Sequence, residues 1–308
     1  MSYAGRFAPS PTGPLHFGSL VAALASYLDA RAHDGKWLLR IEDIDETRCN
    51  SAYTRDILRT LQAFGLHWDG EVQIQTARKA NYGAVLQALR GRGLVYACAC
   101  SRSEIADSAI NGLEGPVYPG TCRDKALSEA GNALRLRTWS EKISFVDLVQ
   151  GEIEQRIDED IGDFVLQRRD GLFAYQLAVV VDDADQGITH VVRGADLLDS
   201  TARQIYLQRL LGYPTPQYLH IPIAVNALGQ KLSKQTLAAA VSGATDAPQV
   251  VLLSALQFLG QSTAGLETTL TLAGFLALAV RNWERRMIPS VRTVPHKIPL
   301  DPSLRSLP

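Results

Sequence analysis

Apolar residues recur along the first hundred positions with two alternating patterns. Short apolar runs predict strands at Tyr3–Ala8, Trp37–Ile41 and Leu94–Ala97. Between these runs, apolar residues at helical spacing predict helices at Ser19–His33, Ser51–Phe64 and Asn81–Arg90. Strands that alternate with helices are typical of βαβ units, so we expect an α/β fold built on a parallel sheet.

The pattern changes at Cys98 and stays short, polar and turn-rich to about Asp170. Strand-like segments occur there only at Leu134–Thr138 and Ile143–Asp147, which indicates an insertion, residues 98–170, within an α/β domain of residues 1–97 and 171–235. Regular patterning then resumes with the segments Tyr175–Val181 and Ile188–Arg193, the helix Ser200–Leu211 and the strand Tyr218–Val225. Helices at Gln249–Leu259 and Leu270–Arg286 predict a helical C-terminal extension, residues 236–308, whose Pro-rich tail from Ile288 should be irregular.

Composition narrows the class of protein without identifying a partner. A hydrophobic fraction of 46% in 308 residues can fill a sizeable core, so the chain should be globular. Lys and Arg total 31 against 32 for Asp and Glu, so an RNA partner would need a local basic patch. We see no secretory signal and no apolar run of about 18 residues, and we expect a cytoplasmic protein with no membrane contact.

Two separate segments have residues suited to ATP. In Pro9–Leu20, His16 and Gly18 stand at a bend before a helix that Ser19 can cap, and a helix N-terminus offers backbone N–H groups to phosphate. In Lys231–Gln235, two lysines can place point charges on a triphosphate. Taken alone, the first is more often a structural cap and the second a solvated basic turn.

The two segments together resemble the signatures of class I aminoacyl-tRNA synthetases. Pro11–Ser19 is similar to the HIGH motif and Lys231–Gln235 to the KMSKS loop, while Arg6–Gly13 and Leu39–Asp45 resemble the glutamyl and glutaminyl branch. The resemblance implies a Rossmann-like catalytic domain, ATP carried with Mg2+, and catalysis by His16, Lys231 and Lys234. The ATP-binding residues that it implies are Pro11, Thr12, Gly13, His16, Gly18, Ser19, Lys231, Ser233 and Lys234.

The same resemblance implies a binding site for L-glutamate. Its residues are Arg6, Ala8, Ser10, Glu42, Tyr175 and Arg193. We assign Glu42 to the ammonium group and the two arginines to the side-chain carboxylate, because a guanidinium can pair with a carboxylate through two parallel hydrogen bonds. The alternative is that Arg6 and Glu42 pair with each other across neighbouring strands.

Three of the four cysteines, Cys98, Cys100 and Cys122, fall in one short segment. In a reducing compartment such a group favours a metal over a disulfide. No histidine lies between His67 and His190, so the fourth ligand of a structural Zn2+ would be an oxygen ligand, a water or a residue from a distant part of the chain, and the resemblance makes Tyr118 the candidate. Three inert thiols are the alternative.

The 73 residues after Gln235 are too few for the anticodon-binding region of full-length glutamyl-tRNA synthetases. Within the family, the chain resembles the glutamyl-Q tRNA(Asp) synthetases in this length, in the residues Phe17, Ser19 and Ile44, and in the segment Arg193–Thr201. The resemblance implies that the acceptor is the queuosine base in the anticodon loop of tRNA(Asp), whose phosphates Arg203 and Arg209 would meet, and we expect a monomer. Alternatives are a shortened glutamyl-tRNA synthetase, a small-molecule ligase or nucleotidyltransferase, and a non-catalytic tRNA-binding paralogue.

Overall fold

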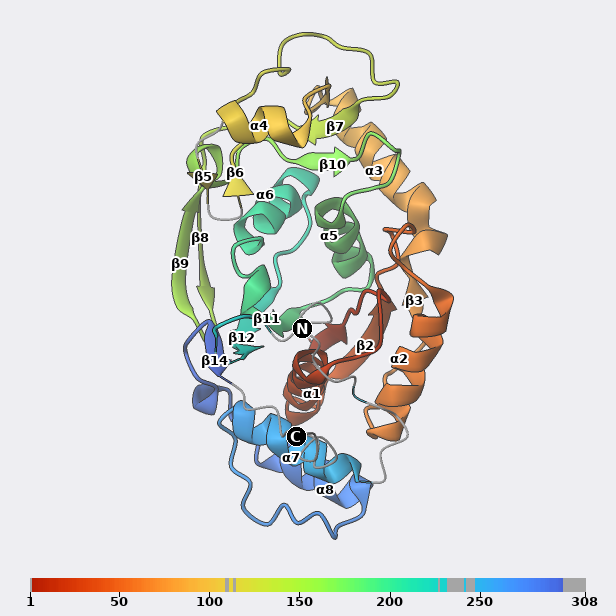
Figure 1. Ribbon diagram of the computed structural model, residues 1–308, viewed down its shortest axis with the longest axis vertical. Coiled ribbons are helices and arrows are strands. Elements are labelled where there is room, and N and C mark those ends of the chain that lie inside the picture. Colours follow the sequence, from red (N-terminus) through yellow and green to blue (C-terminus); the bar gives the residue numbers. More distant parts are fainter. Residues whose placement is uncertain are drawn as a thin grey trace, which may run out of the picture.

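A parallel sheet runs through the middle of the molecule and reverses its strand order beside the first strand (Figure 1). In the computed structural model, which describes residues 2–108, 111–112, 115–226, 228–231, 241 and 247–295, the strand β1 (Ala4–Phe7) pairs in parallel with β2 (Lys36–Ile41), and β2 pairs with β3 (Gln73–Ile74). On the other side of β1 lies β11 (His190–Gly194), which pairs in parallel with β12 (Gln217–Ile221). The backbone N–H of Thr189 donates to the carbonyl of Ala4 at 2.9 Å and joins the two halves.

Helices connect these strands and cover the sheet, as the apolar spacing predicts, so the α/β class is confirmed. Their bounds are α1 (Phe17–Ala32), α2 (Ser51–Ala63), α3 (Lys79–Gly91), α4 (Arg102–Ser108), α5 (Tyr175–Asp185), α6 (Thr201–Leu211), α7 (Pro248–Phe258) and α8 (Leu272–Arg281). The helix α1 is buried along most of its length, because strands cover one side and α7 and α8 the other. Among the described residues, no helix is both long and apolar enough to span a bilayer.

Short antiparallel strands fill the segment between Cys98 and Asp170. The strands β4 (Val95–Cys98), β7 (Ala133–Leu136) and β10 (Val165–Gln167) form one sheet at the top of Figure 1, and β5 (Asn111–Gly112) pairs with β6 (Gly115–Pro116). The hairpin of β8 (Lys142–Asp147) and β9 (Gly151–Arg156) joins the parallel sheet instead, through Asp147 opposite Tyr218 on β12. The boundaries proposed from the sequence for the insertion and the extension stay predictions.

The C-terminal half differs from the sequence expectations in two strands, and the helix expected at Leu270–Arg286 is found as α8, which ends at Arg281. The strand expected at Tyr218–Val225 is divided into β12 and β13 (Ile223–Val225), because Pro222 has no N–H to donate within a strand ladder. The tail expected to be irregular contains β14 (Thr293–Pro295), which pairs in parallel with β13.

The C-terminal extension is tied to α1 through the buried carboxylate of Asp29. This side chain accepts hydrogen bonds from Trp283 Nε1 at 3.0 Å, from Arg285 Nε at 2.6 Å and from the hydroxyl of Tyr3 at 2.5 Å. Although burial opposes it, the hydrogen bonds of Arg285 and Tyr3 hold the pKa of Asp29 below its ordinary value. The last turn of α1 is therefore fixed by residues from both ends of the described chain.

Candidate active site

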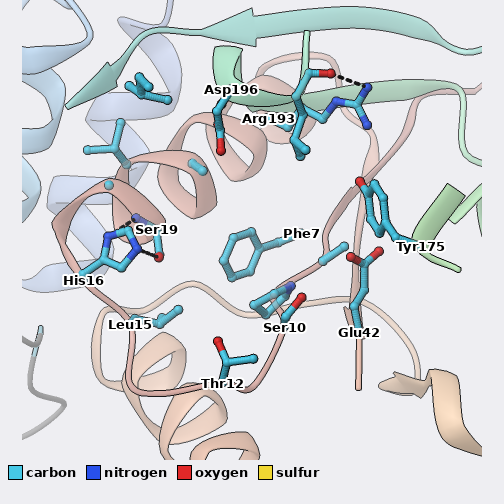
Figure 2. A pocket seen from close by; sticks show the side chains of 18 of the residues that line it. Phe7, Ser10, Thr12, Leu15, His16, Ser19, Glu42, Tyr175, Arg193 and Asp196 are labelled. Atoms are coloured by element: carbon cyan, nitrogen blue, oxygen red, sulfur yellow. Dashed lines mark hydrogen bonds between the residues drawn. The ribbon is translucent and has the colours of Figure 1, made fainter. Parts of the chain in front are cut away.

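A cavity of about 870 Å³ opens at the carboxyl ends of β1 and β11, where the strand order of the sheet reverses. Ligands of open α/β sheets bind at this kind of switch point. Figure 2 shows His16 and Ser19 at one end of the cavity, Glu42, Tyr175 and Arg193 at the other, and Phe7 between them.

His16 forms the start of α1. It is the N-cap residue, and its Nδ1 accepts from the backbone N–H of Ser19 at 3.3 Å, while Nε2 lies 3.0 Å from the Ser19 hydroxyl. The expectation that Ser19 caps this helix is therefore wrong. The imidazole reaches the same backbone group that a capping serine would bind, so the helix begins two residues earlier than the apolar pattern indicates.

The loop between β1 and α1 presents some of its residues to the cavity and buries others. Ala8, Ser10, Thr12, His16, Gly18 and Ser19 line the cavity, together with Phe7 and Leu15. Pro11 and Gly13 are buried beneath it, and the carbonyl of Pro11 accepts from the backbone N–H of Asn50 at 3.0 Å. The two buried residues thus support the loop, while their neighbours reach the cavity.

Of the lysine segment, Lys231 lines the cavity and forms an ion pair with Asp196, which lines it too. Ser233 and Lys234 lie outside the described residues, and their assigned roles stay predictions. Asp196 follows β11 directly and was not singled out from the sequence.

Buried charges underlie the opposite end of the cavity. Arg6 Nε donates to Asp183 at 3.1 Å, and Arg40 Nη2 donates to Asp183 at 2.7 Å and to Glu42 at 3.2 Å. The sequence alternative, a pair between Arg6 and Glu42, is thus replaced by a connected network in which Asp183 joins the two arginines and Arg40 pairs with Glu42. The strand β2 places Arg40 beside Glu42, and α5 supplies Asp183 to Arg6.

Burial raises the pKa of Glu42 above its ordinary value, although the charges of Arg40 and Arg6 act in the other direction. Burial, followed by the nearby charge of Glu42, also raises the pKa of the Tyr175 hydroxyl. Glu42 thus lies in a site where its negative charge is less favourable than in water. A cation bound beside it would restore the balance.

Arg193 at the end of β11 is held by neutral groups. Its Nε donates to His220 Nε2 at 2.9 Å, its Nη1 to Gln204 Oε1 at 2.9 Å, and its Nη2 to the Thr201 hydroxyl at 2.9 Å and the Leu197 carbonyl at 3.3 Å. The side chain lines the cavity, and among the described residues no carboxylate pairs with it. Its positive charge is therefore available to a bound anion.

Sequence reasoning missed the groups that hold these arginines in place. Asp182 and Asp183 follow the apolar run Leu177–Val181 on the helix α5, and both are buried although they are acids. Two adjacent acids in such a helix are a signal, because a carboxylate is almost never buried without a partner. The two buried arginines Arg6 and Arg40, on strands that also pair with each other, are the corresponding cations.

The cysteine cluster lies apart from the cavity, at the end of β4. The sulfur atoms of Cys98, Cys100 and Cys122 lie within 4.8 Å of one another, and those of Cys100 and Cys122 are 3.5 Å apart. The Tyr118 hydroxyl lies 3.3 Å from the Cys98 sulfur and 3.7 Å from that of Cys100. Sulfur atoms bound tetrahedrally to zinc at about 2.3 Å would be about 3.8 Å apart, so the four side chains can hold such an ion with small shifts.

Comparison with known proteins links both regions to one family. The family model of tRNA synthetases class I (E and Q), catalytic domain, matches residues 4–291. A glutamyl-Q tRNA(Asp) synthetase of Dechloromonas aromatica is 53% identical over 290 residues, which cover 93% of this chain and 96% of the relative. The protein of the same name from Burkholderia cenocepacia is 54% identical over 293 residues, covering 93% and 98%. A solved glutamate-tRNA synthetase from Elizabethkingia anophelis has the same fold, with a TM-score of 0.77 at 21% identity over 96% of this chain and 68% of that one.

Proposed function

Because this chain belongs to the class I glutamyl- and glutaminyl-tRNA synthetase family, and within it to the glutamyl-Q tRNA(Asp) synthetases, we propose a two-step reaction for it. The protein activates L-glutamate with ATP and then transfers the glutamate to tRNA(Asp). The observation that carries the proposal is a single cavity with a helix N-terminus at one end and a buried array of Arg6, Glu42, Tyr175 and Arg193 at the other. Such a cavity suits a nucleotide and an amino acid that react with each other.

Activation joins the amino-acid carboxylate to ATP. A carboxylate oxygen attacks the α-phosphorus, the bond from that phosphorus to the bridging oxygen breaks, and pyrophosphate leaves with the electron pair. Negative charge gathers on the phosphate oxygens in the transition state, and cationic or N–H donors fixed near them lower the barrier. His16, Lys231 and Lys234 are our candidates for this role, with Mg2+ carried by ATP.

Glutamate would lie between Glu42 and the arginines. Glu42 binds the ammonium group, which also offsets the unfavourable burial of this carboxylate. Arg193 binds the side-chain carboxylate, since no acid in the described part of the chain pairs with its guanidinium, and Arg6 supports it from the pair with Asp183. Glutamine carries no charge at this position, so the arrangement favours glutamate.

The acceptor is the finer part of the proposal. Relatives more than 50% identical are named for tRNA(Asp) and the Q base, and we assign the same acceptor to this chain, a hydroxyl of the queuosine base. We also place the reaction in the cytoplasm, where tRNA is found.

We further propose that Cys98, Cys100, Tyr118 and Cys122 bind one structural Zn2+. The Tyr118 hydroxyl lies beside the sulfur atoms of Cys98 and Cys100, at 3.3 Å and 3.7 Å, so it can complete a four-ligand site. The ion would fix the end of β4 to the loop that contains Tyr118, away from the reacting atoms.

Pyrophosphate exchange tests the activation step directly. Exchange between labelled pyrophosphate and ATP should require glutamate, proceed without tRNA, and be far weaker with glutamine or aspartate. Lys234→Ala should lower the rate by roughly a hundredfold, the usual cost of losing one fixed donor to developing charge. Equal exchange with glutamine would contradict the amino-acid assignment, and no exchange at all would favour a non-catalytic paralogue.

Transfer of labelled glutamate tests the acceptor. The label should attach to tRNA that carries queuosine, including tRNA from which the terminal adenosine has been removed, and it should not attach to tRNA that lacks queuosine. The opposite result, loss with the terminal adenosine and persistence without queuosine, would identify a shortened glutamyl-tRNA synthetase.

A further inference from the structure

The arginines at the amino-acid end of the cavity are held in two different ways. Arg6 and Arg40 pair with the carboxylate of Asp183, whereas Arg193 is bound by an imidazole, an amide, a hydroxyl and a backbone carbonyl. An arginine buried among neutral acceptors keeps its full charge, because hydrogen bonds fix its orientation without cancelling it. Each neutral partner must therefore be an acceptor at the atom that faces the guanidinium.

His220 is the one of these partners whose role depends on its proton. It is fully buried on β12, and its Nδ1 lies 2.6 Å from Asp147 Oδ2 on β8. The other oxygen of Asp147 accepts backbone N–H groups of Val149 at 3.0 Å, Gln150 at 2.8 Å and His220 at 3.2 Å. Since every recorded partner of this carboxylate donates to it, Nδ1 carries the imidazole proton and Nε2 is left as the acceptor for Arg193.

The imidazole stays neutral in this position. Burial lowers the pKa of His220 to about 4, and the nearby charge of Arg193 acts in the same direction, while the hydrogen bond that His220 donates to Asp147 opposes both. The pKa of Asp147 is held below its ordinary value, although burial opposes it, by the hydrogen bond of His220. At neutral pH the pair is a carboxylate and a neutral imidazole with one defined tautomer.

We propose that Asp147 and His220 are positioning residues for amino-acid binding, which set the Arg193 guanidinium toward the cavity while leaving its positive charge for the ligand's carboxylate. This inference rests on the proposed function of the cavity and adds two residues to it. It also makes the β8–β9 hairpin, which belongs to the segment expected to be an insertion, part of the amino-acid site.

Two replacements of His220 separate its two hydrogen bonds. The side chain of His220→Asn reaches only as far as Nδ1, so it can still bind Asp147 and offers nothing to Arg193. The side chain of His220→Gln reaches as far as Nε2 and can present its oxygen to Arg193. Asp147→Asn introduces an amide donor, which favours the tautomer with a proton on Nε2 and sets two N–H groups against each other.

The measurement is the KM for glutamate and for ATP in pyrophosphate exchange by the full chain. His220→Asn and Asp147→Asn should raise the KM for glutamate tenfold or more, the loss expected when a hydrogen bond to a charged group is broken. The KM for ATP should stay within about twofold, and His220→Gln should recover most of the loss. His190→Asn, on the same strand as Arg193 but at the opposite end, is the matched control and should change neither constant. With Arg193→Lys already in place, His220→Asn should add less than twofold.

An unchanged KM for glutamate in a folded His220→Asn variant would overturn the proposal, as would equal increases in both KM values, which would indicate a general loss of structure. The histidine tautomer gives a test that does not depend on activity. Nitrogen-15 spectra of the wild-type protein should show His220 neutral with its proton on Nδ1, and a proton on Nε2 would overturn the proposal even in a protein without exchange activity. Absence of glutamate-dependent exchange in a wild-type protein with the expected tautomer would count against the proposed function alone.

Discussion

Replacing Asp183 by Asn exchanges a single oxygen for an NH2 group, but it should destabilise the protein strongly. Asp183 accepts from Arg6 Nε and from Arg40 Nη2, and all three side chains are buried. An Asn oxygen can serve one of these arginines, but its NH2 group must then face the other. Removing one partner of a buried ion pair costs about 3–5 kcal/mol, because it leaves an uncompensated charge in the interior.

For a chain of this size that loss corresponds to a fall of roughly 5–15 °C in the unfolding temperature, measured by calorimetry or circular dichroism. Asp185→Asn is the matched control, two residues further along α5. Asp185 is 43% exposed and pairs with Arg78 at the surface, so its loss should cost only about 0–1 kcal/mol. Since Arg6 loses its orientation in Asp183→Asn, the KM for glutamate should rise as well.

The pH dependence gives the sign of the effect. Burial acts against ionisation of Asp183, but the charges of Arg6 and Arg40 hold its pKa below the ordinary value in the folded protein. Such a group stabilises the fold fully above its unfolded pKa of about 3.9, and the stabilisation is lost as the pH falls through the folded pKa. The difference in free energy of unfolding between wild type and Asp183→Asn should therefore be largest at pH 7 and shrink below about pH 4. A variant as stable as Asp185→Asn, or a gap that persists in acid, would refute this reasoning.

Three further outcomes can be checked with the same protein. Cys98→Ser should lower the zinc content from near one per chain and reduce thermal stability, whereas Cys49→Ser should leave the zinc unchanged; a zinc-free wild type would end this assignment. The KM for glutamate should rise as the pH falls through the raised pKa of Glu42, because only the carboxylate binds an ammonium group, and Glu42→Gln should bind weakly at every pH without this acid limb. Transfer to tRNA should weaken as salt rises, and a rate that does not change between low and high salt would argue against contacts to the phosphates.

The parallel part of the fold was predictable from the sequence because its elements obey simple periods. The helices found as α1, α2 and α3 follow apolar spacing closely, and all three differ from the sequence expectation only by one or two residues at their ends. The start of α1 was not predicted correctly, because His16 caps this helix and smaller side chains usually take that role. The strand β14 was not predicted, because three residues carry no readable period and it pairs only with β13, a distant segment of the chain.

For the candidate site, sequence reasoning found several residues that face the cavity, but it missed Asp196, which also lines the cavity, and the residues behind them. Arg6, Glu42 and Arg193 stand in recognisable motifs and all line the cavity, although their roles stay predictions. Asp183 lies 177 positions from Arg6 in the chain, and Asp147 lies 46 positions from Arg193. No local pattern reports such a pairing, because it depends on how helices and strands pack.

The contacts of Asp29 also bear on when α1 becomes fully packed during synthesis. Its partners Trp283 and Arg285 follow it by 254 and 256 residues, so a nascent chain can form β1, α1 and β2 long before either partner has left the ribosome. Until then α1 must either expose Asp29 to water or bury a charge that only Tyr3 meets. Closing so long a loop is slow, and it comes late in vectorial synthesis. The docking of residue 285 would therefore be among the last steps of folding, and an unfinished chain would leave the last turn of α1 without its C-terminal partners until that step.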